Sequence, residues 1–149
     1  MISTLSPVRF AQVPGRIHRS ILIASLRALV CDDYSMVRET IRPLLLDAGF
    51  ETVREATLAT EAISLAELTQ PDAIVLDLSL PGMSGLQAIP ILKLVSPRSV
   101  VVVFSAYDIW REASIEAGAY EYVDKSDLDG LQQVFRRVAS ASALGQRPD

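Results

Sequence analysis

The stretch AIVLDLSLPGMSG, residues 73–85, decides how the rest of the chain is organised. Its first four residues are apolar, and Pro81 and Gly82 end the segment soon after the carboxylate of Asp77. A short apolar run bounded by turn residues is typical of a strand buried on both faces. Because an ionised carboxylate is costly to bury alone, we expect Asp77 at the rim of a sheet, where open α/β sheets place their functional groups.

Three further apolar runs end on polar side chains in the same way. The runs, with the residues that follow them, are 26–31 with Asp32 and Asp33, 100–104 with Ser105, and 120–123 with Asp124 and Lys125. If these strands are parallel, their polar ends converge at one edge of the sheet. The sequence therefore predicts that carboxylates, a hydroxyl and a lysine share one site.

Amphipathic helical patterns alternate with the strands. The expected helices lie between Asp33 and Gly49 and at residues 60–68, 84–95, 108–117 and, after a cap at Ser126, 128–138; residues 51–56 fit an edge strand. Pro43 should bend its helix, and Pro90 should kink its helix or delay the start of that helix. Five alternations with short connections indicate a doubly wound parallel sheet. Since no GxGxxG follows the first strand, we predict the order 2-1-3-4-5, with a site between strands one and three.

Composition favours one globular domain over residues 26–144. Half of the 149 residues are hydrophobic and 21% are charged, and the net charge of −4 argues against direct nucleic-acid binding by this chain. No apolar stretch approaches the ~20 residues of a membrane-spanning helix, so we expect no membrane association. Cys31, the single cysteine, fits a small core residue of a reducing compartment, and we expect a cytoplasmic protein.

The two ends of the chain differ from this domain. Residues 1–25 contain arginines but no acidic residue, a composition that can mark a targeting peptide. The apolar run at residues 21–24 is short and leads directly into the first strand without a cleavage site, so we interpret residues 1–25 as a basic extension. His18, the only histidine, lies there with no neighbour that supports a chemical role. Residues 145–149 are expected to be a frayed tail.

The residue types at the predicted site indicate phosphoryl transfer. Three carboxylates in one cleft repel one another unless some are protonated or a cation holds them. Oxygen ligands suit Mg²⁺, which prefers a phosphate as co-ligand. A lysine and a hydroxyl can hold phosphoryl oxygens, and an aspartate can act as nucleophile to form an acyl phosphate. Asp77, alone at the end of its strand, is the best candidate acceptor.

At these positions the chain resembles the receiver domains of two-component response regulators. The matching segments are CDD at 31–33, VLDLSLPGMSG at 75–85, SA at 105–106 and YVDK at 122–125. The resemblance implies a flavodoxin-like fold and a signalling switch rather than an enzyme with a separate substrate. It also implies a sensor histidine kinase or a histidine phosphotransfer protein as the phosphodonor.

The resemblance further implies a role for each site residue. Asp77 would accept the phosphoryl group, and Mg²⁺ would be the cofactor. Asp33, Asp77 and the Ser79 carbonyl would bind Mg²⁺, and Asp32 would act through water. Lys125 and Ser105 would bind the phosphoryl group. Ser105 and Tyr122 would form the switch, and Ser79 and Tyr107 would tune the lifetime of the phosphoryl group. The switch would change the surface made by residues 108–117, 120–123 and the last helix, which is a candidate surface for a homodimer.

Several alternatives remain open at this point. The family commonly has proline where this chain has Ser126, and lysine followed by serine is similar to receivers that precede a helix-turn-helix output domain. The chain is therefore either a stand-alone receiver or one cut from a DNA-binding output domain. An aspartyl-phosphate hydrolase is disfavoured because Ser79 stands where such enzymes usually place a second acid. A pseudo-receiver used only for protein contacts is disfavoured by the complete set of acids, hydroxyl and lysine.

Overall fold

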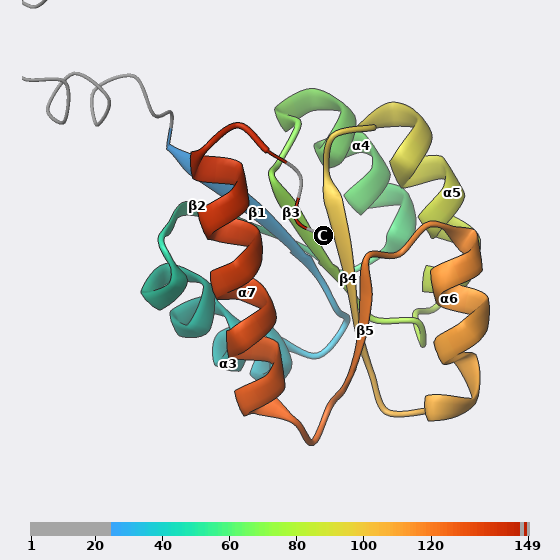
Figure 1. Ribbon diagram of the computed structural model, residues 1–149. Helices are drawn as coiled ribbons and strands as arrows, with labels where there is room; N and C mark the ends of the chain where they lie inside the picture. Colours follow the sequence, from blue (N-terminus) through green and yellow to red (C-terminus); the bar gives the residue numbers. More distant parts are fainter. Residues whose placement is uncertain (1–24, 147, 149) are drawn as a thin grey trace, which may run out of the picture.

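Five parallel strands form the centre of the structure, a computed structural model that describes residues 25–146 and 148 (Figure 1). The strands are β1 (Leu26–Cys31), β2 (Phe50–Ala56), β3 (Ala73–Leu76), β4 (Val100–Ser105) and β5 (Glu121–Asp124). Their order is β2-β1-β3-β4-β5, as the sequence predicts, with β2 at one edge. Parallel pairing of β1 with β3, and of β3 with β4, places the carboxyl ends of these strands together.

Helices cover both faces of the sheet. They are α3 (Ser35–Ala48), α4 (Ala59–Thr69), α5 (Gly85–Val95), α6 (Arg111–Ala117) and α7 (Leu128–Ala143), with a short 3₁₀ helix, η2 (Asp108–Trp110), before α6. Figure 1 shows α3 and α7 together on one face and α4, α5 and α6 on the other. Right-handed connections require this arrangement, because the chain crosses the sheet in one direction from β1 to β2 and in the opposite direction from β2 through β5.

The central strands are apolar throughout because both of their faces are covered. Every residue of β3 and β4 is buried, and successive residues enter opposite cores. In β1, for example, Val30 packs with α3 and α7, whereas Leu29 and Cys31 pack with α4 and α5. Burial, and then the nearby Asp32, raise the pKa of the Cys31 thiol to about 12, so it stays protonated and unreactive. The prediction of Cys31 as a core residue is confirmed.

Four details of the predicted helices are wrong. The helix expected at 108–117 is split into η2 and α6. Asp127, not Ser126, caps α7: its Oδ1 accepts a hydrogen bond from the Gly130 N–H at 2.9 Å. Ser126 is instead engaged by Asp124, whose carboxylate accepts from its N–H and its hydroxyl. The third detail is the expected late start of α5, and the fourth is the expected burial of three apolar side chains.

The start of α5 and the exposure of three apolar side chains also differ from the sequence predictions. Pro90 does not delay α5, because Ser84 and Gln87 form a capping box that starts the helix at Gly85. Three apolar side chains within the predicted helices are exposed, each in a terminal turn of its helix: Met36, Leu68 and Leu128. Terminal turns contact fewer neighbouring elements, so periodicity alone overestimates burial there.

Candidate functional site

Four strand ends bring the predicted polar side chains together. Asp32 and Asp33 follow β1, Asp77 follows β3, Ser105 ends β4, and Lys125 follows β5. Asp32, Asp77 and Ser105 are buried, whereas Asp33 is exposed. Because adjacent β1 and β3 lead to Asp32 and Asp77, two carboxylates meet at the point where the strand order reverses.

Asp77 is more deeply placed than the sequence predicts. It lies at the rim of the sheet, directly after β3, as expected, but its side chain is only 3% exposed. The backbone N–H of Asp77 donates to the Cys31 carbonyl at 3.0 Å, and its Oδ1 accepts from the Ser79 N–H at 3.3 Å. Lys125 supplies the compensating charge that makes this burial tolerable.

Lys125 is the cation at the centre of the site. Its Nζ lies 2.9 Å from Asp32 Oδ2 and 3.3 Å from Asp77 Oδ2. The Lys125 N–H donates to the Ser105 carbonyl at 2.9 Å, which joins the ends of β4 and β5. Burial lowers the pKa of Lys125, but its hydrogen bond to Asp32 and the charge of Asp77 outweigh this effect and raise the pKa overall. Lys125 therefore remains an ammonium ion.

The carboxyl of Asp77 is electrostatically strained despite this partner. Burial raises its pKa, and the neighbouring Asp32 raises it further, while Lys125 and the Ser79 N–H lower it without cancelling the increase. The ionised form of Asp77 is thus less stable in the folded protein than in water. A group that binds its negative oxygens would relieve this cost.

This strain predicts a pH-dependent effect of Asp77→Asn on stability. Below the ordinary pKa of 3.8 the carboxyl is protonated in both the folded and the unfolded state, so the two proteins should have similar free energies of unfolding. As the pH rises through 3.8 toward the raised pKa, only the wild-type protein loses stability, and the variant should become the more stable. Urea unfolding without divalent cations, from pH 3 to pH 8, measures this difference. A difference that does not change with pH would contradict the prediction.

Gly85 allows α5 to begin against the segment that carries Asp77. A Cβ at this position would overlap the backbone carbonyl oxygen of Asp77 and lie 2.7 Å from Leu78 Cα. The Gly85 N–H also donates to the Leu78 carbonyl at 2.9 Å. The glycine of the opening stretch is therefore required for close approach of two backbone segments.

The three carboxylates fit a small divalent cation. Asp32, Asp33 and Asp77 each offer an oxygen, and these atoms lie within 4.8 Å of one another. Oxygen donors, one of them exposed, match the preference of Mg²⁺ for a few carboxylates with retained waters. Ser79, the other predicted contributor, is exposed on the loop after β3, and its N–H contacts Asp77. The donor chemistry of this acidic cluster is therefore suited to Mg²⁺.

A cavity beside Asp77 provides space for a phosphoryl group. It has a volume of about 440 Å³, and its lining includes Asp33, Asp77, Ser105, Tyr107 and Lys125. Ser105 is completely buried, and its Oγ has no hydrogen-bond partner of normal geometry among the described residues, although the Tyr122 hydroxyl is near it. A buried hydroxyl without such a partner is costly, and a ligand oxygen in the cavity would satisfy it.

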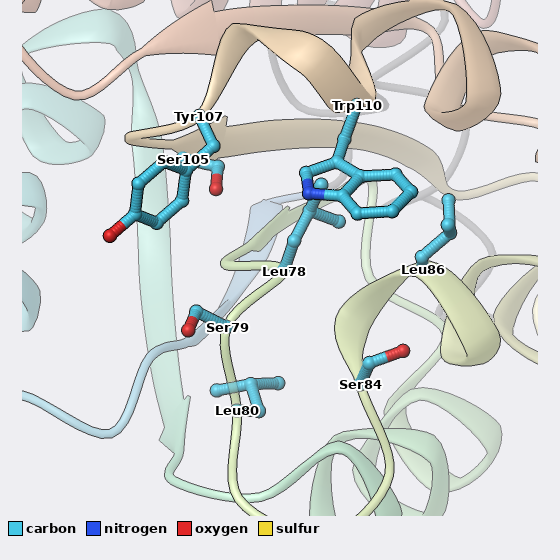
Figure 2. A pocket seen from close by; sticks show the side chains of 8 residues that line it. All are labelled: Leu78, Ser79, Leu80, Ser84, Leu86, Ser105, Tyr107 and Trp110. Atoms are coloured by element: carbon cyan, nitrogen blue, oxygen red, sulfur yellow. The ribbon is translucent and has the colours of Figure 1, made fainter.

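An apolar hollow of about 400 Å³ adjoins this cavity. Figure 2 shows Tyr107 and Trp110 projecting from the segment after β4 toward the loop that carries Leu78 and Ser79. Tyr107 lines both hollows and is 61% exposed. Tyr107 therefore lies between the acidic cluster and the apolar hollow.

Tyr122 lies inward, against the segment that follows β4. Its side chain is 2% exposed, and its hydroxyl donates a hydrogen bond to the Tyr107 carbonyl. Burial raises the pKa of the Tyr122 phenol, so it remains a protonated donor at neutral pH. Tyr122, the predicted switch residue, is thus connected to Ser105 through the backbone between Ser105 and Tyr107.

Two arginines near the site are absent from the sequence predictions. Arg38 donates from NH1 to the Asp32 carbonyl at 2.7 Å and from Nε to Glu55 Oε1 at 2.7 Å, which secures the end of β1. Arg111 contacts Tyr122 through its guanidinium group. Both lie on helices that pass beside the strand ends, and no local sequence pattern distinguishes them from solvated surface arginines.

Comparison with known proteins identifies the class of this fold and site. A family model described as "Response regulator receiver domain" matches residues 28–136. The nitrate/nitrite response regulator protein homolog of Haemophilus influenzae is 32% identical over 123 residues, which cover 80% of this chain and 59% of that protein. The chain thus spans somewhat more than half of that relative's length.

Solved structures agree with this assignment. A two-component response regulator of the LuxR family from Aurantimonas sp. SI85-9A1 superposes with a TM-score of 0.70 at 31% identity, covering 83% of this chain and 89% of that one. A response regulator from Burkholderia pseudomallei, solved with a phosphorylated aspartic acid, calcium ion and citrate, has a TM-score of 0.68 at 26% identity, covering 81% and 72%.

The chain belongs to the receiver domain family of two-component response regulators. Receiver domains are phosphorylatable signalling switches that histidine kinases or phosphotransfer proteins phosphorylate, and they bind Mg²⁺ at an acidic pocket. Receiver domains are signalling switches and not typical enzymes. Some relatives are protein-glutamate methylesterases, but they have this activity through other domains. None of the described helices combines the length and apolar character needed to cross a bilayer.

Proposed function

We propose that Asp77 accepts a phosphoryl group from a histidine kinase or a histidine phosphotransfer protein, with Mg²⁺ bound by Asp32, Asp33 and Asp77. The observation that carries this proposal is the meeting of a buried, strained Asp77 carboxylate with Lys125 and the buried Ser105 hydroxyl in one cavity. The receiver unit would comprise residues 26–144, preceded by the basic extension and followed by a short tail.

In the proposed reaction an Asp77 oxygen attacks the phosphorus of a phosphohistidine. The new O–P bond forms as the P–N bond breaks, and its electron pair stays on the imidazole nitrogen of the donor. Lys125, already 3.3 Å from Asp77 Oδ2, would pair with a phosphoryl oxygen, and Ser105 Oγ would donate to another. Bound Mg²⁺ would neutralise charge on the phosphoryl oxygens. Binding at these groups would relieve the cost of burying the Asp77 charge beside Asp32.

Stoichiometric labelling tests this function. With Mg²⁺ and a small acyl-phosphate donor, intact-protein mass spectrometry should show the gain of one phosphoryl group per chain. An unchanged mass under these conditions would refute the proposal. Continuous turnover of a phosphate ester would instead support an aspartyl-phosphate hydrolase, a function that the exposed Ser79 hydroxyl in place of a second acid makes unfavourable.

The lifetime of the phosphorylated form should depend on Tyr107. Hydrolysis needs a water molecule in line with the acyl-phosphate bond, and the largely exposed Tyr107 lines the cavity beside Asp77. We expect Tyr107→Ala to change the decay rate by several-fold, well below the roughly 10²- to 10⁴-fold effect of a positioned general base, because the side chain restricts access without taking part in proton transfer. Loss of the phosphoryl mass with time measures the rate. Equal half-lives for the two proteins would remove a role for this side chain; Ser79 is the second position to test.

Phosphorylation should change the surface formed by α6, β5 and α7. The group adds about −1.5 to −2 charges, and its contacts with Ser105 and Lys125 would draw in the segments after β4 and β5. We propose that this surface mediates a homodimer or partner contact. Amide NMR shifts with and without beryllofluoride measure the change, together with sedimentation for self-association. Shifts confined to residues around Asp77 would falsify this proposal.

A further inference from the structure

Arg38, near the start of α3, contacts the ends of two strands beside the acidic cluster. Its side chain is only 16% exposed. Its NH1 donates to the backbone carbonyl of Asp32 at 2.7 Å, and its Nε donates to Glu55 Oε1 on β2, also at 2.7 Å. The planar guanidinium can make both bonds at once because its N–H groups point in fixed directions. One side chain of α3 thus joins the end of β1 to the end of β2.

The carbonyl that Arg38 holds belongs to the peptide between Asp32 and Asp33. The N–H of Asp32 donates to the Ala56 carbonyl at 3.1 Å, so this residue is held on both sides of its backbone. The Asp32 carboxylate has a further anchor in Lys125, whose Nζ lies 2.9 Å from Oδ2, whereas Asp33 is exposed. The direction of the Asp33 side chain therefore depends on the orientation of the preceding peptide.

We propose that Arg38 is a positioning residue for the acidic cluster, which orients the carboxylates of Asp32 and Asp33 toward Mg²⁺ by fixing the peptide that joins them. The inference rests on the proposed Mg²⁺ site and adds the residue that sets the geometry of its ligands. Arg38 acts through a backbone oxygen and is not a metal ligand, because a guanidinium has only donor groups. Removing a group that orients metal ligands typically lowers metal affinity by about 10- to 100-fold.

Charge and positioning predict opposite effects of removing Arg38. A guanidinium beside carboxylates repels a second cation, so loss of its charge alone should strengthen the binding of divalent cations. Loss of positioning should weaken this binding, and more for Mg²⁺, which demands nearly octahedral geometry, than for the more adaptable Ca²⁺. In Arg38→Gln we therefore expect the dissociation constant to rise about tenfold for Mg²⁺ and about two- to threefold for Ca²⁺.

Arg42→Gln is the matched control for this substitution. Arg42 lies one turn further along α3 and also pairs with Glu55, with NH1 at 3.3 Å from Oε2. The same NH1 donates to the Val53 carbonyl, within β2, at 3.1 Å. Both variants thus remove one positive charge from the same helix and from the same carboxylate, but only Arg38→Gln releases the carbonyl between the two aspartates. Arg42→Gln should leave both dissociation constants unchanged.

Arg38→Lys separates the geometry of the side chain from its charge. An ammonium keeps the positive charge but lacks the planar fork that makes two directed bonds to two partners. If orientation of the peptide decides the affinity, Arg38→Lys should also bind Mg²⁺ several-fold more weakly than the wild type. Retained charge with reduced affinity is a result that electrostatics alone does not produce.

Titration of the full chain with magnesium chloride and, separately, with calcium chloride tests this inference. Backbone amide NMR shifts at constant ionic strength give the dissociation constants, and a dispersed amide spectrum shows that each variant is folded. Arg38→Gln that binds Mg²⁺ as tightly as the wild type, or more tightly, overturns the role of Arg38. An equal loss of affinity in Arg42→Gln, or equal losses for the two cations, overturns it as well.

The lysine variant and the wild type complete the test. Arg38→Lys answers the same question if the glutamine variant is not folded, and wild-type Mg²⁺ affinity in Arg38→Lys overturns the inference. An absence of Mg²⁺-dependent shifts around Asp33 and Asp77 in the wild type would instead overturn the proposed metal site itself, and this inference with it. The two failures are therefore distinguished by the wild-type titration alone.

Discussion

Asp77→Asn is expected to abolish phosphoryl incorporation from an acyl-phosphate donor. The amide keeps the shape of the side chain but cannot serve as the nucleophile for an acyl phosphate. The wild type should gain one phosphoryl mass per chain and the variant none, as measured by intact-protein mass spectrometry. Partial labelling of the variant would show that another residue accepts the group.

Asp33→Ala separates the metal site from the acceptor. This change leaves Asp77 and its contact with Lys125 in place but removes one oxygen ligand of the acidic cluster. We therefore expect Mg²⁺-dependent labelling to be lost although the acceptor remains. Asp47→Asn is the matched control, because Asp47 is an exposed carboxylate paired with Arg136 outside the site. Normal labelling of Asp33→Ala, or lost labelling of Asp47→Asn, would contradict the assignment.

Lys125→Met is expected to destabilise the protein in the absence of metal and to increase its affinity for Mg²⁺. Without the ammonium, Asp32 and Asp77 remain buried with no cation between them, which should lower the free energy of unfolding by about 3 kcal/mol. The same oxygens become free for a metal ion, so Mg²⁺ should recover much of this loss. Urea unfolding with and without Mg²⁺, together with calorimetric titration, measures both effects.

Lys93→Met provides the control for this prediction. Lys93 is also partly buried, but its Nζ donates to the backbone carbonyls of Pro97 and Ser99 on another part of the molecule. Its loss should lower stability without changing Mg²⁺ affinity. If Lys125→Met bound Mg²⁺ no more tightly than the wild type, the ammonium and the metal would not compete for the same carboxylates.

The relation between stability and activity at this site follows from these two substitutions. Asp77→Asn should increase stability at neutral pH while removing the acceptor, and Lys125→Met should decrease stability while exposing the acids to metal. The site therefore keeps like charges close together at a cost in folding free energy. Ligands that bind these carboxylates relieve this electrostatic cost, and the relief adds to their binding free energy.

The sequence by itself determined the sheet and the location of the site. Continuous apolar runs that end on Asp32, Asp77, Ser105 and Lys125 require strands buried on both faces, with their polar ends at one edge. These features depend on local pattern and on the small number of topologies available to alternating strands and helices. Their prediction from sequence is confirmed for that reason.

Only the tertiary structure decided the depth and the connections of the site. The burial of Asp77 depends on Lys125, which is 48 positions away, and the split of the helix expected at 108–117 accompanies contacts of Arg111 with Asp108 and Tyr122. Such side chains are surface residues by local pattern and become site residues through contacts between distant segments. Periodicity reports which face of an element is apolar. Charge compensation and the inward position of Tyr122 are set by packing between elements, which no single segment encodes.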